Sequence, residues 1–424
     1  MCWIKKHLSN ILLLSFLPIT ALAGADYNYH GTLNIIPGTG HIRANWQITV
    51  LDDTENNITF FLRNTLGEVE VEGASIKRFD ISQGEEVEGL ETAPFRKLQF
   101  ELAEQPSPRV IHISYAGVLL PEPMHNLINA IEPGRIELNV DSFWFPIDAR
   151  FNKLLTADLT VIVDGEWQGV TTGEVEIIED GVHILNTDPR QDIAMTLSQS
   201  FRISEADGFT VYDQRDNSKG LQKLMEAARV CKQYLDRQFG TVKPLPRGKL
   251  LITKRSSSGY ARQNYVVFTD ISSAETGPLT RFVCHEFAHY WSIGADFTTV
   301  ENWLNEAFAE YIGVMAVREH LGEEAYLQML QSFRDNITAK DLPPVWVSGD
   351  TKRGPYLVQY RKAPLLLAEL ETRIGRDRFM QYTQAWLLQP VRTTPALLEL
   401  LEQITDKDER DWFEQALGSS ETLQ

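Results

Sequence analysis

Two short segments constrain this chain more than any other part of its sequence. His285-Glu286-Phe287-Ala288-His289 spaces two histidines four residues apart, and on a helix such residues lie on one face. Trp303-Leu304-Asn305-Glu306 follows, with sixteen residues between His289 and Glu306, and begins a second helix-like apolar segment, which we expect to present Asn305 and Glu306 to the same point. The two imidazoles and the Glu306 carboxylate can therefore converge on one metal ion.

The residue types favour a catalytic zinc site. Zinc takes about four ligands in a tetrahedron, and His285, His289 and Glu306 would leave the fourth position open, with one Zn²⁺ expected per chain. Glu286 points to the side of the metal, where it can take a proton from water. The alternative, a structural zinc site, would need a further His or Cys, and Cys284 points about 100° away from His285 around the helix.

The first 23 residues have the pattern of a secretory signal peptide. Lys5 and Lys6 precede the apolar run Ile11–Leu17, and Ala21-Leu22-Ala23 offers small residues for cleavage. The run is short for a membrane span and Pro18 interrupts it. We therefore expect a secreted or periplasmic protein without a transmembrane span once the signal is removed.

Composition limits the partners. The 424 residues carry a formal net charge of −18, which argues against nucleic acid as a partner. Cys231 and Cys284 would remain after signal cleavage, and an oxidising compartment permits a disulfide between them. The sequence does not show that they meet, and it leaves the oligomeric state open.

Hydrophobic periodicity divides the mature chain into two regions. Residues 24–206 alternate apolar and polar positions in short segments, which predicts a β-rich, sandwich-like domain. Residues 207–424 change to mostly helical spacing, with short strands expected at Leu250–Thr253 and Tyr265–Phe268. Helices are expected at Thr280–Ile293, with the two histidines, and at Asn302–Glu319. The segments predicted as strands in the first region are Ile42–Val50, Thr59–Phe61, Lys97–Leu102, Val110–Tyr115, Asp158–Val163 and Gly173–Ile178.

The two metal-ligating segments together resemble the gluzincin metallopeptidases of the membrane alanyl aminopeptidase family. That family shares His-Glu-x-x-His and a Trp-Leu-Asn-Glu segment, and the likeness is strongest between Arg281 and Tyr311. Phe143-Trp144-Phe145-Pro146 resembles the family's aromatic segment near the end of its β-domain. The resemblance implies a thermolysin-like α+β catalytic domain with a helical carboxyl end, and hydrolysis of peptide or protein substrates, with Glu286 as the base.

A tyrosine is expected beside the metal as well. Tyr360-Arg361-Lys362-Ala363 resembles the family segment whose tyrosine stabilises the tetrahedral oxyanion, and a phenol hydrogen bond suits that role. Tyr356 is the fallback, and a core tyrosine is the structural alternative. Glu310, one turn after Glu306, could hold a ligand imidazole in place or be an ordinary solvated residue.

The chain departs from the family where the free amino terminus of a substrate is bound. Gly259 to Asn264 stands in place of the exopeptidase motif, and Gln263 replaces its glutamate, so Gln263 and Asn264 are the substrate-binding candidates. An uncharged amide pairs less strongly with an ammonium group, and the adjacent Arg262 would repel one. The strand Tyr265–Phe268 could still bind an extended peptide by edge addition.

Several functions therefore stay open. The first is an aminopeptidase-like zinc peptidase, and the second is an endopeptidase or specialised peptidase that does not recognise free amino termini. A third is a non-catalytic peptide-binding relative, although no zinc ligand has been lost. Arg281 and Arg353 could contact a substrate carboxylate or form surface salt bridges.

Overall fold

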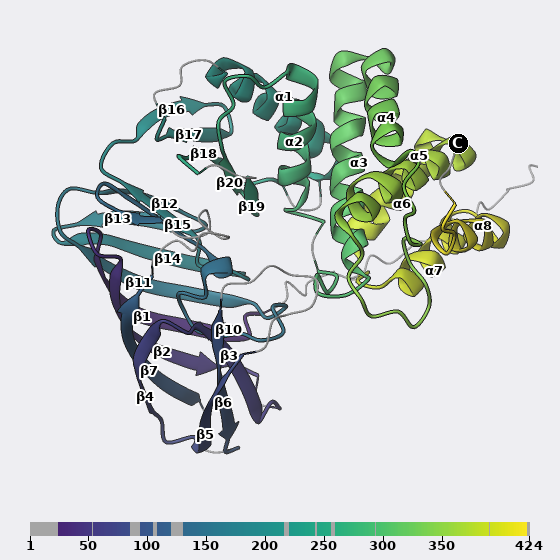
Figure 1. The fold of residues 1–424 in the computed structure, drawn as a ribbon. Helices are drawn as coiled ribbons and strands as arrows, with labels where there is room; N and C mark the ends of the chain where they lie inside the picture. The colour runs from purple at the N-terminus through teal and green to yellow at the C-terminus, as the bar shows by residue number, and fades with distance from the viewer. Residues whose placement is uncertain are drawn as a thin grey trace, which may run out of the picture.

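The computed structural model describes residues 24–52, 54–84, 94–104, 108–119, 130–215, 220–241, 244–255, 259–292, 294–389 and 391–421. The predicted signal peptide lies outside them. In the described chain a β-rich region is followed by a mixed sheet with helices, and helices alone form the carboxyl end (Figure 1). None of the described helices is both long enough and apolar enough to cross a membrane.

Three sheets build the amino-terminal region. Strand order is β13-β14-β11-β1-β2-β7-β4 in the largest, β10-β3-β6-β5 in the second and β12-β15-β9-β8 in the third. Strands β1 and β2 alternate buried and exposed residues, so one face of their sheet is apolar and packs into the core of the amino-terminal region. The strands are β1 Tyr27–Ile36, β2 His41–Val50, β3 Asn57–Arg63, β4 Leu66–Glu72, β5 Ile76–Gln83, β6 Phe95–Leu102, β7 Arg109–Val118, β8 Ala130–Glu132, β9 Arg135–Leu138, β10 Ile147–Asp148, β11 Leu155–Val163, β12 Gln168–Thr171, β13 Glu174–Ile178, β14 Gly181–Arg190 and β15 Met195–Ser198, with a short 3₁₀ turn η1 at Val140–Ser142.

A five-stranded mixed sheet begins the second region. Its order is β16-β17-β18-β20-β19, and helix α1 connects the parallel strands β17 and β18 as a crossover. The boundary expected between residues 206 and 207 falls inside the β16–β17 hairpin, so this sheet already begins at Arg202. The strands are β16 Arg202–Ala206, β17 Phe209–Asp213, β18 Gly248–Ile252, β19 Tyr260–Arg262 and β20 Tyr265–Phe268.

Helices α1 and α2 lie beside this sheet, and the remaining helices pack onto them and against each other (Figure 1). Helix α3 is buried over most of its length because α1, α2, α4 and α5 surround it, which explains its apolar residues on every side. The helices are α1 Leu221–Phe239, α2 Thr276–Ala288, α3 Asn302–Leu321, α4 Glu323–Ile337, the π-helical turn η2 Val358–Lys362, α5 Ala363–Ile374, α6 Arg376–Leu388, α7 Thr394–Ile404 and α8 Lys407–Leu417.

Strand β20 lies between the two regions and is buried on both faces. Val266 and Phe268 join the helical core, whereas Tyr265 and Val267 pack in a small cluster with Val170 of β12. Because β20 also lies between β18 and β19 in the sheet, the prediction that it binds a peptide at a sheet edge is wrong. Strand β19 takes the edge position because it pairs only with β20 among the described strands.

Candidate active site

The two histidines and Glu306 meet where α2 ends beside the start of α3. Nε2 of His285 lies 3.1 Å from Nε2 of His289, and Oε2 of Glu306 lies 3.5 Å from each of them. Helix α2 begins four residues earlier than predicted and ends at Ala288, so His289 is its C-cap. The C-cap keeps right-handed helical dihedrals, which preserves the one-turn spacing of the imidazoles.

This donor set fits a metal ion. Oε2 of Glu306 is buried and has no hydrogen-bond partner among the described residues, although such an atom is costly to bury unsatisfied. Burial opposes its charge, yet the nearby imidazoles of His285 and His289, 3.5 Å from Oε2, hold the pKa of Glu306 well below its usual value. A carboxylate and two imidazoles directed at one point are the ligands that zinc prefers, and a cation there would satisfy the orphaned oxygen.

Glu286 lies beside the same point. Ligand atoms of His285, Glu286 and His289 all lie within 4.8 Å of one another. Only 6% of the Glu286 residue surface is exposed, and this burial raises the pKa of its carboxyl above the usual value, while the two histidines oppose the shift. A raised pKa suits a group that must both accept and return a proton near neutral pH.

Glu310 holds the first histidine from behind. Its Oε2 lies 3.0 Å from Nδ1 of His285, which leaves Nε2 of that ring directed toward His289 and Glu306. Burial would raise the pKa of Glu310, but Arg281, the hydrogen bond to His285 and Arg361 outweigh it and lower the pKa to about 2. Arg361 donates to Oε1 of Glu310 at 2.7 Å, and Arg281 pairs with the same oxygen.

The solvated alternative for Glu310 is therefore wrong, since the residue is 1% exposed. The carboxylate-binding role considered for Arg281 is unsupported too, because its guanidinium is committed to Glu310. Arg361 was not singled out from the sequence. Its only sequence signal is its position directly after Tyr360.

Tyr360 lies over the metal site from the π-helical turn η2. Its ring stacks on the imidazole of His285, with centroids 5.7 Å apart and planes inclined by 23°. Burial raises the pKa of Tyr360 well above its usual value, and Glu306 raises it further, so the phenol stays a hydrogen-bond donor. Tyr356 stacks on Tyr360 at 4.5 Å but is 58% exposed, which places it one layer further out.

The residues predicted to bind substrate separate in the structure. Gln263, with a φ of 59°, occupies the turn between β19 and β20 and lines the cavity that contains the metal site. Asn264 is buried, and its Nδ2 donates to the carbonyl of Arg247 at 2.8 Å, away from this cavity. Asn305, expected to face the metal, instead accepts a hydrogen bond from the backbone of Ala295 and fixes that loop.

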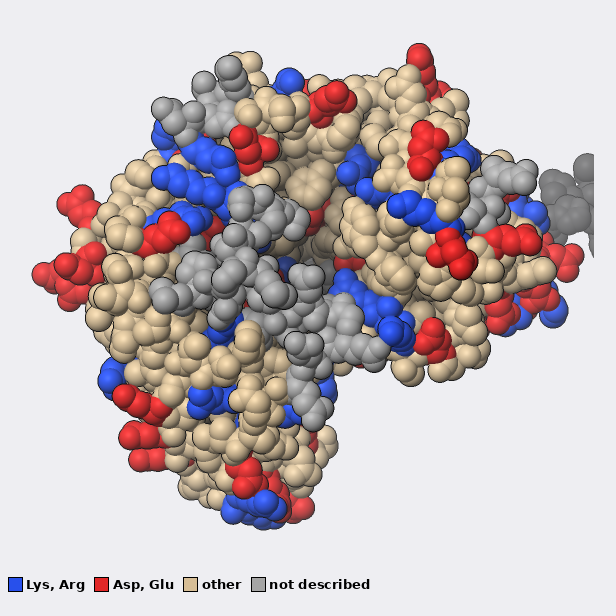
Figure 2. All heavy atoms as spheres, viewed as in Figure 1, with Lys and Arg blue, Asp and Glu red and all other residues tan. Residues whose placement is uncertain are grey.

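The cavity has a volume of about 550 Å³ and is bounded by both regions of the chain. The helical side contributes His289, Glu306 and Tyr360, and the β-rich side contributes Asp141, Asp148 and Arg190. On the face drawn in Figure 2, acidic and basic side chains are interspersed over both regions. The site is therefore completed only where the two regions pack together.

A disulfide supports the histidine helix. Cys231 of α1 is bonded to Cys284 of α2, with Cα atoms 5.1 Å apart, and both residues are fully buried. Cys284 directly precedes His285, so the bond joins the helix that carries the two histidines to its neighbour in the core. This pairing resolves what the sequence left open.

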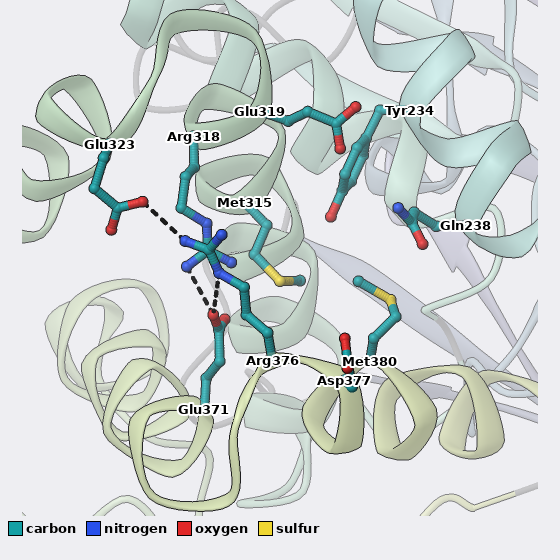
Figure 3. Close-up of a pocket in the computed structure, with 10 residues that line it drawn as sticks. All are labelled: Tyr234, Gln238, Met315, Arg318, Glu319, Glu323, Glu371, Arg376, Asp377 and Met380. Atoms are coloured by element: carbon teal, nitrogen blue, oxygen red, sulfur yellow. Dashed lines mark hydrogen bonds and ion pairs between the residues drawn. The ribbon is translucent and has the colours of Figure 1, made fainter.

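A second cavity of about 350 Å³ lies at the opposite end of α3, between α1 and α6 (Figure 3). Here donors surround Glu371. It accepts a hydrogen bond from the Tyr311 hydroxyl at 2.6 Å and forms ion pairs with Arg318 at 2.7 Å and Arg376 at 3.5 Å. Arg376 also pairs with Glu323 at 2.8 Å. These charges satisfy one another, so the cluster connects four helices and presents no free ligand set.

No family model matches the sequence, and no curated protein matches it either. Solved structures do share its fold. The M1 zinc metallopeptidase from Deinococcus radiodurans superposes with a TM-score of 0.67 at 14% identity, over 94% of each chain. A mutant of that enzyme bound to a Tyr-Ser-Ala substrate superposes with a TM-score of 0.65 at 16% identity, again over 94% of each chain.

Leukotriene A4 hydrolase from Saccharomyces cerevisiae is similar as well. It superposes with a TM-score of 0.71 at 14% identity, over 94% of this chain and 69% of the yeast chain. These superpositions show that the chain shares the fold of these enzymes: a β-rich amino-terminal region followed by a mixed region with a helical carboxyl end. At identities this low, they show the fold alone.

Proposed function

We propose that this protein is a zinc-dependent peptidase. The observation that carries the proposal is the triangle of His285 Nε2, His289 Nε2 and Glu306 Oε2, with separations of 3.1, 3.5 and 3.5 Å around an otherwise unsatisfied buried oxygen. These three residues would hold one zinc ion. Similarity in fold to M1 zinc metallopeptidases supports the same metal.

The chain's own groups account for the proton movements of peptide hydrolysis. When bound, zinc supplies Lewis acidity that makes water a nucleophile near neutral pH and polarises a carbonyl. Glu286 accepts the proton of the attacking water and returns it to the amine nitrogen as the C–N bond breaks. The Tyr360 hydroxyl donates a hydrogen bond to the developing oxyanion, and Glu310 fixes the ring of His285.

A further question is whether the enzyme recognises the free amino terminus of its peptide substrate. An aminopeptidase must neutralise a free ammonium group, and Gln263 provides no charge for that purpose. We therefore favour hydrolysis of peptides without recognition of a free amino terminus, with aminopeptidase activity as the alternative. The D. radiodurans mutant bound to a Tyr-Ser-Ala substrate supports a peptide substrate for either activity. We also propose export of the protein, on the basis of its first 23 residues.

A direct assay tests the activity. The purified protein is given amino-acid arylamides and internally quenched peptides with blocked ends, before and after zinc removal by a chelator. Cleavage that disappears with the metal and returns with zinc supports the proposal. Turnover that persists without zinc, or no cleavage of either substrate class, would contradict it.

A matched tyrosine pair tests the oxyanion role. Tyr360→Phe removes only the hydroxyl and should lower kcat about 100- to 1,000-fold with little change in KM, as loss of one oxyanion donor does. Tyr356→Phe removes a hydroxyl one layer further out and should keep kcat near the wild-type value. Equal effects of the two substitutions would remove Tyr360 from the reaction.

A further inference from the structure

The acidic groups that line the metal cavity on its β-rich side are already paired. Asp148 accepts from Arg150 at 2.8 Å, and Asp192 accepts from Arg262 at 2.7 Å. Asp141 also pairs with Arg262, at 3.3 Å. Each of these carboxylates therefore has a guanidinium partner, and Asp141 and Asp192 share that of Arg262.

Arg190 differs from the other basic residues of this wall. It ends strand β14, lines the cavity and is only 8% exposed, yet its Nε has no hydrogen-bond partner in the part of the chain that the structure describes. The carboxylate paired with it, Asp188, lies 3.6 Å away and is 82% exposed, so water weakens that attraction. Burial lowers the pKa of Arg190, and Asp188 offsets only part of this effect.

The neighbour that shares the cavity wall with Arg190 is neutral. Nη1 of Arg190 donates to Oε1 of Gln263, which orients the guanidinium without compensating its charge. Gln263 is the residue that stands where the resembling family has an acidic one. With Gln263 at this position, the cavity lacks a carboxylate that could bind a substrate ammonium group. The buried guanidinium of Arg190 is instead held in the cavity wall without a carboxylate from Gln263.

Resting on the proposed peptidase function, we propose that Arg190 and Gln263 form an anion subsite that binds a carboxylate of the peptide substrate. A guanidinium presents donors in a planar fork that matches a carboxylate, and a partly desolvated pair of this kind is strong. The carboxylate can belong to an acidic side chain or to the carboxyl terminus of the peptide. Both sources have the same chemistry, and the experiment separates them.

Two peptide pairs serve as probes. The first pair is acetylated and amidated and differs only in Glu against Gln at one position, which is moved along the peptide. The second pair has neutral side chains and ends in a free carboxylate or an amide. The zinc-loaded protein should prefer the carboxylate member of one pair by about 10- to 100-fold in kcat/KM, the range for a charged hydrogen bond.

Two substitutions then assign the preference to Arg190. Arg190→Gln should bring the ratio within the preferred pair toward one, and Gln263→Glu should do the same by compensating the guanidinium. Because the ratio compares two peptides on one protein sample, it does not depend on the fraction of protein that is folded. Arg353→Gln tests the rival contact: Arg353 lines the same cavity and could also contact a carboxylate, but it is more exposed than Arg190, so the preference should survive its removal.

Binding measurements separate this proposal from the peptidase activity. If no peptide is cleaved, dissociation constants for the same pairs, measured by calorimetry, should still show the carboxylate preference and its loss in Arg190→Gln. A ratio near one in the wild-type protein, or a preference that survives Arg190→Gln, would overturn the anion subsite. Loss of the preference in Arg353→Gln but not in Arg190→Gln would also overturn it.

Discussion

The two ends of α3 each gather carboxylates and guanidinium groups in a cavity, but with opposite results. At the far, carboxyl end, Glu371 pairs with Arg318 and Arg376 (Figure 3). It also accepts a hydrogen bond from Tyr311. At the near end, Glu306 keeps a buried oxygen without a hydrogen-bond partner among the described residues, directed at two imidazoles. A compensated cluster stabilises the fold, whereas an uncompensated one is prepared for a ligand.

The largest expected effect is on the reaction at the near end. Glu286→Gln should lower kcat by about 100- to 10,000-fold because the general base is lost. Since burial raises the pKa of Glu286, a neutral amide should not lower the melting temperature. Steady-state kinetics and scanning calorimetry on the same sample check both statements. Wild-type turnover would exclude Glu286 as the base.

At the far end, the same kind of substitution should instead act on stability. Glu371→Gln leaves the partly buried guanidinium of Arg318 without its carboxylate, which typically costs about 3 kcal/mol. Denaturant unfolding measures the loss, and zinc affinity should stay at the wild-type value. A changed zinc affinity would show that the two ends of α3 are coupled and would break the comparison.

Zinc should stabilise the protein only through the near end. At a free concentration about 100 times its Kd, zinc should add about 2.7 kcal/mol to the free energy of unfolding. In Glu306→Gln this gain should shrink because a charged ligand is lost. Melting curves with and without zinc test this, and Glu371→Gln is the control that should keep the full gain. An undiminished gain in Glu306→Gln would remove that ligand from the site.

The smallest expected effect concerns the residue behind the ligand. Glu310→Gln keeps a hydrogen-bond acceptor for His285 but removes its charge, and zinc affinity should fall about 10- to 100-fold. Competition with a chromophoric chelator measures the change. An unaltered affinity would mean that Glu310 serves only to compensate Arg281 and Arg361.

The parts of the site that could be predicted are those in which spacing along one helix decides geometry. The shared face of His285 and His289 follows from helical periodicity, and Glu306 was expected from a second apolar helix. For Glu310, on that second helix, the sequence left a contact with a ligand imidazole and a solvated position open. The β-rich region was equally visible, because alternation over segments such as Ile42–Val50 signals a half-buried strand. The burial of both faces of β20 could not be predicted, since an apolar run of four residues does not indicate which elements pack on each face.

By itself, the sequence determined that His285 and His289 share one helix face, because helix geometry is local and repeats every few residues. The packing of α3 beside α2 then placed the Glu306 carboxylate against the two imidazoles. Only the tertiary structure decided the rest of the cavity. Arg190 and Gln263 are 73 residues apart and share no local pattern, yet they hydrogen-bond across the junction of the two regions. Whether a charge is compensated depends on every neighbour in space, and periodicity along the chain carries no information about those neighbours.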